Sequence, residues 1–516
     1  MTIRPVVPRG ARRSALVAEW CSRAGRSLID GTGTRHLHIL LIKPKARLAS
    51  ILGLQAWQLL EPLELGYLAA AAGPDHLIKI LDLRLAAWPT MALERALRRF
   101  RPDLVGITGY SHEGSIVKAL ARQVRRRLPG AMVVVGGHHA TVDPQDYRID
   151  AIDAIVRGEG CGPFRMLVDA VAAGQPLEGI PQVLLPAVTW PDGATDEWPQ
   201  FPDPAGLPEP RRDLWDPRVY RGVWTGERLP RLHPLFPRVA MVRTSWGCKM
   251  RCSFCIVPHL CRGMHQPRPV DAVADEIARA PAQHIYFSDD ENFIDEHFAW
   301  ELAEALARRG VRKRYFAWTR ATTINRSPEL LKRWREIGLD AAFIGFEFPT
   351  DAELKRAAKG GSVAANERAL DKLRSMDIAV HAAFMVQPEY GEAEIDWLRR
   401  YVQGLPPVQC SFTVCTPSPG TPDYAAMEPR IWVDNPHDLH DCMHPLTPTR
   451  LPLRQFAYRF ADLATDALQK VPMRVNRHLP PPPDLAKVAW ASHRYHRGLR
   501  SVYRDYPRDL WDWDPS

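Results

Sequence analysis

The sequence lacks the long apolar segments that a membrane protein requires. No stretch approaches the roughly 18 uninterrupted apolar residues of a transmembrane helix. The first 30 residues contain six arginines but only the short apolar run 15–18, whereas a secretory signal needs a longer apolar core. We therefore expect a cytoplasmic protein with no transmembrane segment and with a basic leader over residues 1–35.

Cysteine is scarce and the charge is nearly balanced. The chain has 9 cysteines in 516 residues, and three of them fall within residues 248–255, which in a cytosolic protein favours metal or redox chemistry over disulfides. A net charge of +9 over this length is a small excess, so we expect no nucleic-acid partner. The first strand–helix turn also lacks a Gly-x-Gly-x-x-Gly motif, which disfavours a dinucleotide.

The first part of the chain alternates apolar strands with helical segments. Apolar runs begin at residues 38, 78, 104, 132 and 154, and helix-like stretches separate them. Near-continuous apolar strands of this kind indicate a parallel sheet with both faces covered. We predict a doubly wound, Rossmann-like α/β domain over residues 36–185.

A ligand of such a sheet binds at the carboxyl ends of the strands, where glycines allow a close backbone approach. The residues at these ends are Gly106, Thr108, Gly109, Tyr110, Gly136, Gly137, His138, Gly158, Glu159 and Gly160. Turn glycines of an ordinary flavodoxin-like domain are the alternative interpretation.

The rest of the chain divides into three further segments. Residues 186–237 are rich in proline and tryptophan and are predicted to be a linker. Six strand-and-helix repeats follow in residues 238–425 and predict a partial (β/α)6 TIM-like barrel, and residues 426–516 predict a mostly helical C-terminal domain. Four polar residues at corresponding strand ends should face one mouth, although each could also be a helix cap: Asp289, Asp290, Arg320 and Glu347.

Three cysteines follow the first strand of these repeats. Cys248, Cys252 and Cys255 have the spacing Cys-x-x-x-Cys-x-x-Cys, which can present three thiolates to one metal centre. Iron–sulfur clusters are normally held by four cysteines, so three would leave one iron open for catalysis. A zinc site completed by Cys261 and His259, or simple buried thiols, are the alternatives.

This cysteine motif on the first loop of a six-unit barrel resembles the radical S-adenosylmethionine superfamily. The preceding domain, with Gly-Gly-His-His-Ala-Thr at 136–141 and Arg-Gly-Glu-Gly at 157–160, resembles the cobalamin-binding domain of its B12-dependent branch. The segments 344–347 and 417–422 match the same branch, and residues 444–453 are similar to the hopanoid C-3 methylase group.

The resemblance implies three cofactors and a role for each candidate residue. Cys248, Cys252 and Cys255 would hold a [4Fe–4S] cluster whose open iron binds S-adenosylmethionine (SAM). The SAM contacts implied are Ser288, Asp289 and Asp290 near the methionine end, Arg320 at the carboxylate, Glu347 at the ribose and Phe254 near the adenine. Cobalamin would lie on the glycine loops without a histidine ligand, with Arg84 or a nearby group filling its lower face.

The activity implied is that of a B12-dependent radical SAM C-methyltransferase. It would transfer a methyl group from SAM, via methylcobalamin, to a carbon of a small-molecule or natural-product substrate, with an external electron donor of the flavodoxin or ferredoxin type. Tyr315 and Tyr390 are candidate proton donors or acceptors, although tyrosines at strand ends usually pack. A non-methylating cyclase or rearrangement enzyme, and a non-catalytic corrinoid or zinc-binding protein, are the alternative functions.

Overall fold

The computed structural model describes residues 35–188, 190, 199, 204–226, 233–406, 408–474 and 481–512. The predicted basic leader, apart from its last residue, and parts of the predicted linker lie outside the described residues. The chain forms two compact units, which are described separately. The first falls within Met1–Ala46, Pro62–Pro202 and Gly206–Trp215, and the second within Arg47–Glu61, Asp203–Ala205 and Asp216–Ser516.

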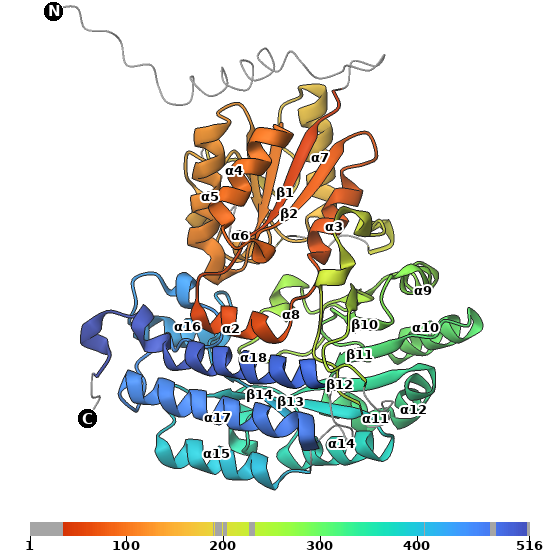
Figure 1. Cartoon of the computed structure of the whole chain (residues 1–516), viewed down its shortest axis with the longest axis vertical. Coiled ribbons are helices and arrows are strands. Elements are labelled where there is room, and N and C mark those ends of the chain that lie inside the picture. Colours follow the sequence, from red (N-terminus) through yellow and green to blue (C-terminus); the bar gives the residue numbers. More distant parts are fainter. Residues whose placement is uncertain are drawn as a thin grey trace, which may run out of the picture. The chain divides into compact units, whose positions relative to one another are not determined.

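The first unit is built on a six-stranded sheet with the order β2-β1-β3-β4-β5-β6 (Figure 1). Five strands are parallel, and β6 pairs antiparallel with β5. The strands are β1 (His38–Lys43), β2 (Leu77–Asp82), β3 (Leu104–Thr108), β4 (Met132–Gly136), β5 (Ala154–Val156) and β6 (Val183–Leu184). The predicted doubly wound α/β fold is therefore confirmed.

Helices cover both faces of this sheet. The helices are α3 (Leu63–Ala71), α4 (Pro89–Phe100), α5 (Gly114–Arg127), α6 (His138–Val142) and α7 (Cys161–Ala173). Apolar side chains of α4 and α5 share one core with alternate residues of β1, β3, β4 and β5. Helices α3 and α7 pack together elsewhere in the unit. Burial of the strands on both sides explains their near-continuous apolar sequences.

The second unit contains six parallel strands whose order in the sheet, β14-β13-β12-β11-β10-β7, follows their order in the sequence. They are β7 (Val239–Val242), β10 (His284–Phe287), β11 (Arg314–Thr319), β12 (Leu339–Glu347), β13 (Ala379–Val386) and β14 (Gln409–Val414). A short antiparallel pair, β8 (Ser245–Trp246) and β9 (Gln266–Pro267), follows the first strand. The six predicted strand-and-helix repeats are thus present as one continuous parallel sheet.

Helices connect these strands and extend the unit toward the C-terminus. They are α8 (Val257–Leu260), α9 (Val270–Arg279), α10 (Glu296–Arg308), α11 (Ala321–Arg326), α12 (Pro328–Ile337), α13 (Asp351–Arg356), α14 (Val363–Ser375), α15 (Glu392–Gly404), α16 (Pro422–Met427), α17 (Leu453–Arg474) and α18 (Pro482–Arg500). Alternate residues of each strand face these helices or the opposite side of the sheet. On β11, Tyr315 joins the helix-facing core, whereas Phe316 lies in a separate cluster with Trp224 and Tyr286.

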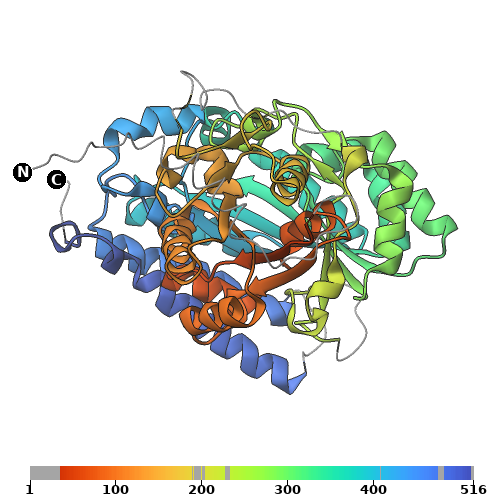
Figure 2. The ribbon, with the colours of Figure 1, turned by 90° about the horizontal axis from the view of Figure 1, so that it is seen from above.

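A helix near the start of the chain belongs to the second unit. Helix α2 (Ala49–Trp57) packs against α18, and α17 and α18 lie side by side (Figure 1, Figure 2). The crossing of α2 and α18 is close, because a Cβ on Gly53 would lie 2.7 Å from Tyr495 Cα and one on Gly498 would lie 2.4 Å from the Ala49 carbonyl oxygen. Residues 47–61 therefore interrupt the predicted cobalamin-binding segment 36–185, whose limits stay a prediction.

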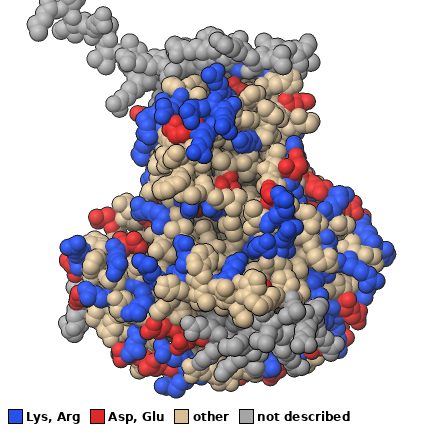
Figure 3. Space-filling model, in the orientation of Figure 1, with Lys and Arg blue, Asp and Glu red and all other residues tan. Residues whose placement is uncertain are grey.

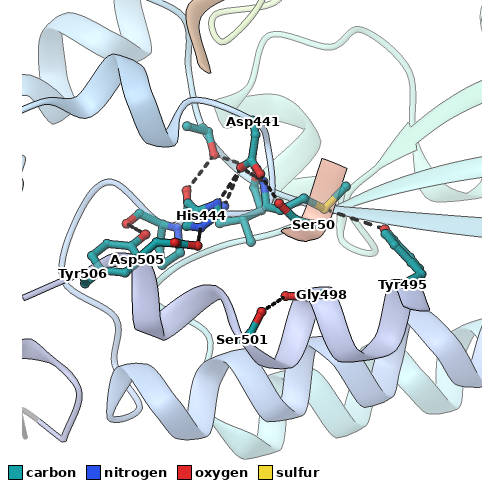
Figure 4. Close-up of polar contacts among 12 residues, drawn as sticks. Ser50, Asp441, His444, Tyr495, Gly498, Ser501, Asp505 and Tyr506 are labelled. Carbon is teal, nitrogen blue, oxygen red and sulfur yellow. Dashed lines mark hydrogen bonds and ion pairs between the residues drawn. The ribbon is translucent and has the colours of Figure 1, made fainter. Parts of the chain in front are cut away.

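A buried ionic network holds the C-terminal part of the second unit (Figure 4). His444 Nδ1 lies 2.9 Å from a carboxylate oxygen of Asp441, and His444 Nε2 lies 3.1 Å from a carboxylate oxygen of Asp505. Ser50 on α2 donates to the other Asp441 oxygen at 2.6 Å. Burial alone would lower the pKa of His444, but the two carboxylates outweigh it and raise this pKa to about 9. The network thus joins α2, the segment after β14 and the C-terminal segment around a buried imidazolium.

No helix in the described part of the chain has both the length and the apolar character that a membrane crossing requires.

Candidate functional site

The loop that carries the cysteines is fixed by a buried carboxylate at the end of β10. Asp289 accepts hydrogen bonds from the backbone and hydroxyl of Thr244 at 3.1 and 2.8 Å, and from the backbone and hydroxyl of Ser245, the latter at 2.7 Å. These two residues connect β7 to the cysteine loop. These hydrogen bonds, together with the nearby Arg243, only partly offset the cost of burial, which raises the pKa of Asp289 above its usual value.

Gly247 makes the turn into the cysteine loop. Its φ of +88° is in the left-handed region, and a Cβ there would lie 2.1 Å from the Met264 carbonyl oxygen. Its backbone N–H donates to Asp290 at 2.9 Å. Only glycine fits this position. Asp289 thus fixes the segment that leads into the cysteine loop, and Asp290 fixes the turn at Gly247.

Cys248, Cys252 and Cys255 are brought together by this loop as free thiols. Burial, together with the nearby charges of Cys252, Asp290 and Cys248, raises the pKa of Cys255 to about 12. Metal ligation requires the thiolate form, so the positive charge of a bound cluster would be needed to hold these thiols ionised. Three thiols on one loop are the donor set that an iron–sulfur cluster with one open iron requires.

The alternative zinc site fits less well. Among the described residues, no three histidine, cysteine or acidic side chains converge closely enough to hold a single ion. A structural zinc needs four convergent ligands, whereas in a cubane cluster each thiolate binds a different iron. Cys261 lies close to Gly247, but it does not complete a single-ion site with His259 in this arrangement.

A cation at the end of β11 contacts the cysteine loop. The Arg320 guanidinium donates to Cys252 Sγ at 3.4 Å and also to the Lys359 carbonyl oxygen. Its Nε is buried without a hydrogen-bond partner among the described residues. Arg320 is thus close to the sulfur ligands and keeps one donor available for a further anionic group.

The end of β12 places a second charged pair at the same side of the sheet. Glu347 forms an ion pair with Lys359, and its φ of +62° is rare for a residue with a side chain. A Cβ on Gly345 would lie 2.0 Å from the Glu347 carboxylate and 2.7 Å from Lys359 Nζ. The glycine two residues earlier therefore leaves the space in which this pair forms. The sequence predicted Glu347 but not Lys359.

Phe254 packs in a small apolar cluster with Phe348, Leu354, Met385 and Cys415, which lie at or beyond the ends of β12, β13 and β14. Ser253 next to it donates its backbone N–H to the Ala357 carbonyl at 3.0 Å and its hydroxyl to Asp423 at 2.8 Å. These contacts hold the cysteine loop against the carboxyl ends of the last three strands.

Two buried oxygens near the cysteine loop lack partners in the described part of the chain. They are Ser288 Oγ and Glu291 Oε2, and the other Glu291 oxygen accepts from the Thr319 hydroxyl at 2.8 Å. Burial raises the pKa of Glu291 to about 7. Sequence reasoning missed Glu291. The signal was its place in the run Asp289-Asp290-Glu291, where three consecutive carboxylates exceed what a helix cap needs.

The two candidate tyrosines have different surroundings. Tyr315 is fully buried, stacks on Phe287 and meets the edge of Trp334, so it lies on the helix-facing side of the sheet. This placement favours the packing interpretation. Tyr390, beyond β13, donates to Glu353, and burial raises its pKa well above the ordinary value.

In the first unit, side chains converge at the carboxyl ends of β1, β3 and β4. Tyr110 lies with its ring 4.9 Å from Lys43 Nζ and 6.1 Å from the His138 ring. Lys43 forms a 2.6 Å ion pair with Glu64. Although burial alone would lower it, the carboxylate raises the pKa of Lys43 above its usual value. Tyr110 is half exposed at this edge.

Glycine loops shape the same edge. Gly137 has a φ of +93°, and a Cβ there would lie 2.5 Å from Thr108 Oγ1 and 3.1 Å from the Gly109 nitrogen. The Gly158 N–H donates to Thr141 Oγ1 at 2.9 Å, which joins the segments that follow β4 and β5. The predicted Thr108, Gly109, Gly136 and Gly137 therefore do lie together.

Three other predicted residues have local partners. Gly106 is inside β3, where a Cβ would lie 2.8 Å from Leu41, so its small size serves packing within the sheet. Glu159 accepts the N–H of Cys161 at the start of α7 at 3.0 Å. Arg84 binds Asp82 through two guanidinium nitrogens, at 2.9 and 2.6 Å, at the end of β2.

Comparison with known proteins agrees with this two-unit arrangement. Residues 50–168 match the B12 binding domain family, and residues 242–402 match the Radical SAM superfamily. Hopanoid C-3 methylase of Methylococcus capsulatus is 30% identical over 77% of this chain and 74% of that protein. The anaerobic magnesium-protoporphyrin IX monomethyl ester cyclase of Cereibacter sphaeroides is 28% identical over 66% of this chain and 56% of that protein.

Two solved structures share the fold. The radical SAM methyltransferase TsrM of Kitasatospora setae, with cobalamin and a [4Fe–4S] cluster bound, has a TM-score of 0.60 at 18% identity and covers 91% of this chain and 99% of its own. The cobalamin-dependent radical enzyme OxsB has a TM-score of 0.63 at 16% identity, over 95% of this chain and 77% of its own.

The two family matches, over the doubly wound α/β unit and over the six-strand sheet with its cysteine loop, define the class as radical SAM enzymes with a B12-binding domain. The chain belongs to the cobalamin-dependent radical SAM enzymes, the family that includes hopanoid C-3 methylase. The matches to the B12 binding and radical SAM families and the methylase relative place it with the B12-dependent radical SAM methyltransferases. The predicted class of enzyme is confirmed.

Proposed function

We propose that this chain transfers a methyl group from SAM to a carbon atom of a small molecule. The observation that carries the proposal is the buried loop with Cys248, Cys252 and Cys255, held by Asp289 beside Arg320. When bound, the cofactors supply a 5′-deoxyadenosyl radical and a transferable methyl group, which together make an unactivated carbon reactive.

The residues of the second unit would bind and orient SAM. The three cysteines hold the cluster, and Arg320 Nε donates to the SAM carboxylate. Ser288 Oγ and Glu291 Oε2, both buried without partners among the described residues, accept from the amino group. Asp289 and Asp290 act by fixing the cysteine loop. Glu347 binds the ribose, and Phe254 lies against the adenine.

The residues of the first unit would bind cobalamin at the carboxyl edge of the sheet. Gly136, Gly137, Gly158 and Gly160 would let the corrin ring approach the backbone, and Tyr110 with His138 would contact it from the adjacent loop. Arg84 remains our candidate for the lower face, because Asp82 holds its guanidinium in place.

The first acceptor to test is a hopanoid. The support is the 30% identity with hopanoid C-3 methylase over three quarters of that protein. We further propose that the enzyme receives electrons from an external flavodoxin- or ferredoxin-type donor, because radical cleavage of SAM consumes one electron. We also propose that it works in the cytoplasm.

The test uses anaerobically purified chain with bound cofactors, SAM labelled in its methyl group, a chemical reductant and a hopanoid. We expect label in the hopanoid and formation of 5′-deoxyadenosine. Cys255→Ala should abolish both, while Arg320→Lys should keep the iron and lower SAM cleavage. If 5′-deoxyadenosine forms but no label reaches the hopanoid or any acceptor from a cell extract, the methyl-transfer proposal is wrong. A cyclase or rearrangement reaction would then be the function to test.

A further inference from the structure

The first unit has a basic depression at the edge opposite to the glycine loops. It has a volume of about 560 Å³ and is lined by Arg122, Arg125, Arg126, Arg148, Ile149, Asp150 and Ala151. Arg122, Arg125 and Arg126 lie in the C-terminal half of α5, shortly before β4 begins. Residues 149–151 lie shortly before β5 begins. The depression therefore lies at the amino ends of the strands. Figure 3 shows Lys and Arg side chains gathering over α4 and α5 of this unit.

The cations of α5 differ in whether they have a carboxylate partner. Lys118 pairs with Asp146 at 2.5 Å, Arg127 with Glu94 at 2.6 Å, and Arg125 with Asp153. Arg122 and Arg126 are exposed and have no ion-pair partner among the described residues. They are four positions apart on one face of the helix, where like charges repel. An anion bound in the depression would relieve this repulsion.

The other two guanidiniums are held in position. Arg125 donates to the Pro129 and Ala131 carbonyls at 2.8 and 3.0 Å. Arg148 lies 5.0 Å from the centre of the Trp190 ring and donates to the Val188 carbonyl at 3.2 Å. A favourable helix dipole explains basic residues in the last turn of α5, but it explains neither Arg122 nor the arginine from the opposite wall. Asp150 is the one carboxylate in the lining.

We propose that this depression binds a phosphate-bearing anion. Guanidinium groups bind phosphate through paired, charge-assisted hydrogen bonds. Arg122 and Arg126 carry charge that no carboxylate of the described residues pairs with, Arg148 is oriented by Trp190, and Arg125, which pairs with Asp153, completes the wall between them. The phosphate comes either from a soluble phosphate compound or from the headgroup of an anionic lipid, and Arg122, Arg126 and Arg148 would recognise both.

The proposed site is independent of the methyl-transfer chemistry. It lies at the amino edge of the sheet, whereas the predicted cobalamin loops lie at the carboxyl edge of the same strands. Binding is therefore measured directly, without any readout of enzyme activity. Failure of the phosphate site would leave the proposed function untouched, and failure of methyl transfer would leave the phosphate site untouched.

The test compares the full chain with Arg122→Ala/Arg126→Ala. The control is Arg368→Ala/Arg400→Ala, which removes two exposed arginines of α14 and α15 that have no ion-pair partner among the described residues. Binding of pyrophosphate is measured by calorimetry at low salt, and binding of phosphatidylcholine vesicles with and without phosphatidylglycerol is measured by sedimentation. Far-UV circular dichroism checks that all three proteins are folded.

We expect the chain and the control to bind pyrophosphate, and the Arg122/Arg126 variant to bind it about tenfold more weakly or worse. If the lipid is the source, anionic vesicles will also bind, the variant will bind them roughly thirtyfold more weakly, and pyrophosphate will displace them. Pyrophosphate binding without vesicle binding identifies a soluble ligand. Absence of pyrophosphate binding, or equal binding by the variant, would overturn the proposal.

Discussion

The cysteine loop of the second unit and the glycine loops of the first unit are fixed in different ways. Asp289, a buried carboxylate, holds the cysteine loop through hydrogen bonds to Thr244 and Ser245. The glycine loops instead depend on the absence of side chains, as the contact between Gly137 and Thr108 shows. The first arrangement should therefore be sensitive to the loss of a charge, and the second to the addition of a methyl group.

The largest effect is expected for Asp289→Asn. The amide keeps one acceptor oxygen but replaces the other with an NH2 group that faces the Thr244 N–H, and hydrogen bonds to a charged group contribute about 1.5–3 kcal/mol each. We predict little bound iron after anaerobic reconstitution and a clearly lowered unfolding temperature. Asp295→Asn makes the same chemical change at the N-cap of α10, where asparagine caps equally well, and should keep iron and stability. Normal iron content in Asp289→Asn would show that the loop does not depend on this carboxylate.

A second buried charge extends the comparison to the C-terminal segment. Asp441 and Asp505 raise the pKa of His444 from 6.5 to about 9, so the imidazolium stabilises the fold fully below pH 6.5 and loses this contribution as the pH rises through 9. The effect is on the order of 3 kcal/mol. The free energy of unfolding of the natural chain, measured with a denaturant between pH 6 and pH 9, should fall by this amount.

The matched variants for this pH dependence are His444→Gln and His496→Gln. His444→Gln removes the buried cation, so this variant should be less stable than the natural chain near pH 6. Its free energy of unfolding should also change less between pH 6 and pH 9. The second changes a partly exposed histidine that contacts Asp462 at 2.9 Å and should keep the natural slope. Equal slopes in both variants would assign the pH dependence to other groups.

The smallest effect on stability is expected for Gly137→Ala, which tests the glycine loops. A left-handed backbone with a side chain, together with the contact to Thr108, should cost about 2 kcal/mol locally. We predict a lower cobalamin content with unchanged iron. Gly130→Ala, at a glycine with open space around it, is the control and should retain both cofactors. An equal fall in iron and cobalamin would mean that the two sites are not separately fixed.

Much of the fold followed from apolar periodicity, but one helix did not. Most of the parallel strands are largely apolar runs, and the sequence located all eleven of them. Helix α2 was missed because residues 49–57 have little polar contrast and no side chain caps the helix at Leu48. Its place in the second unit depends on the close contact of Gly53 and Gly498 with their neighbours, which is a tertiary feature that no local pattern contains.

The candidate site was predictable where its residues occur in one short segment. The cysteine spacing and the two aspartates after β10 were visible in the sequence. The pairing of Lys359 with Glu347 was not, because it depends on a strained residue at the end of β12 and a loop 12 positions later. Glu291 was missed because the sequence does not show which of three adjacent carboxylates is buried with an unpartnered oxygen.

The central claim is that three thiolates hold a cluster in a chain that also binds cobalamin. The most direct measurement is the iron, sulfide, zinc and cobalamin content of the anaerobically purified chain, with its visible spectrum. We predict about four irons and four sulfides per chain together with cobalamin, and no iron in Cys255→Ala. A chain that contains one zinc, or neither iron nor cobalamin after reconstitution, would contradict the account.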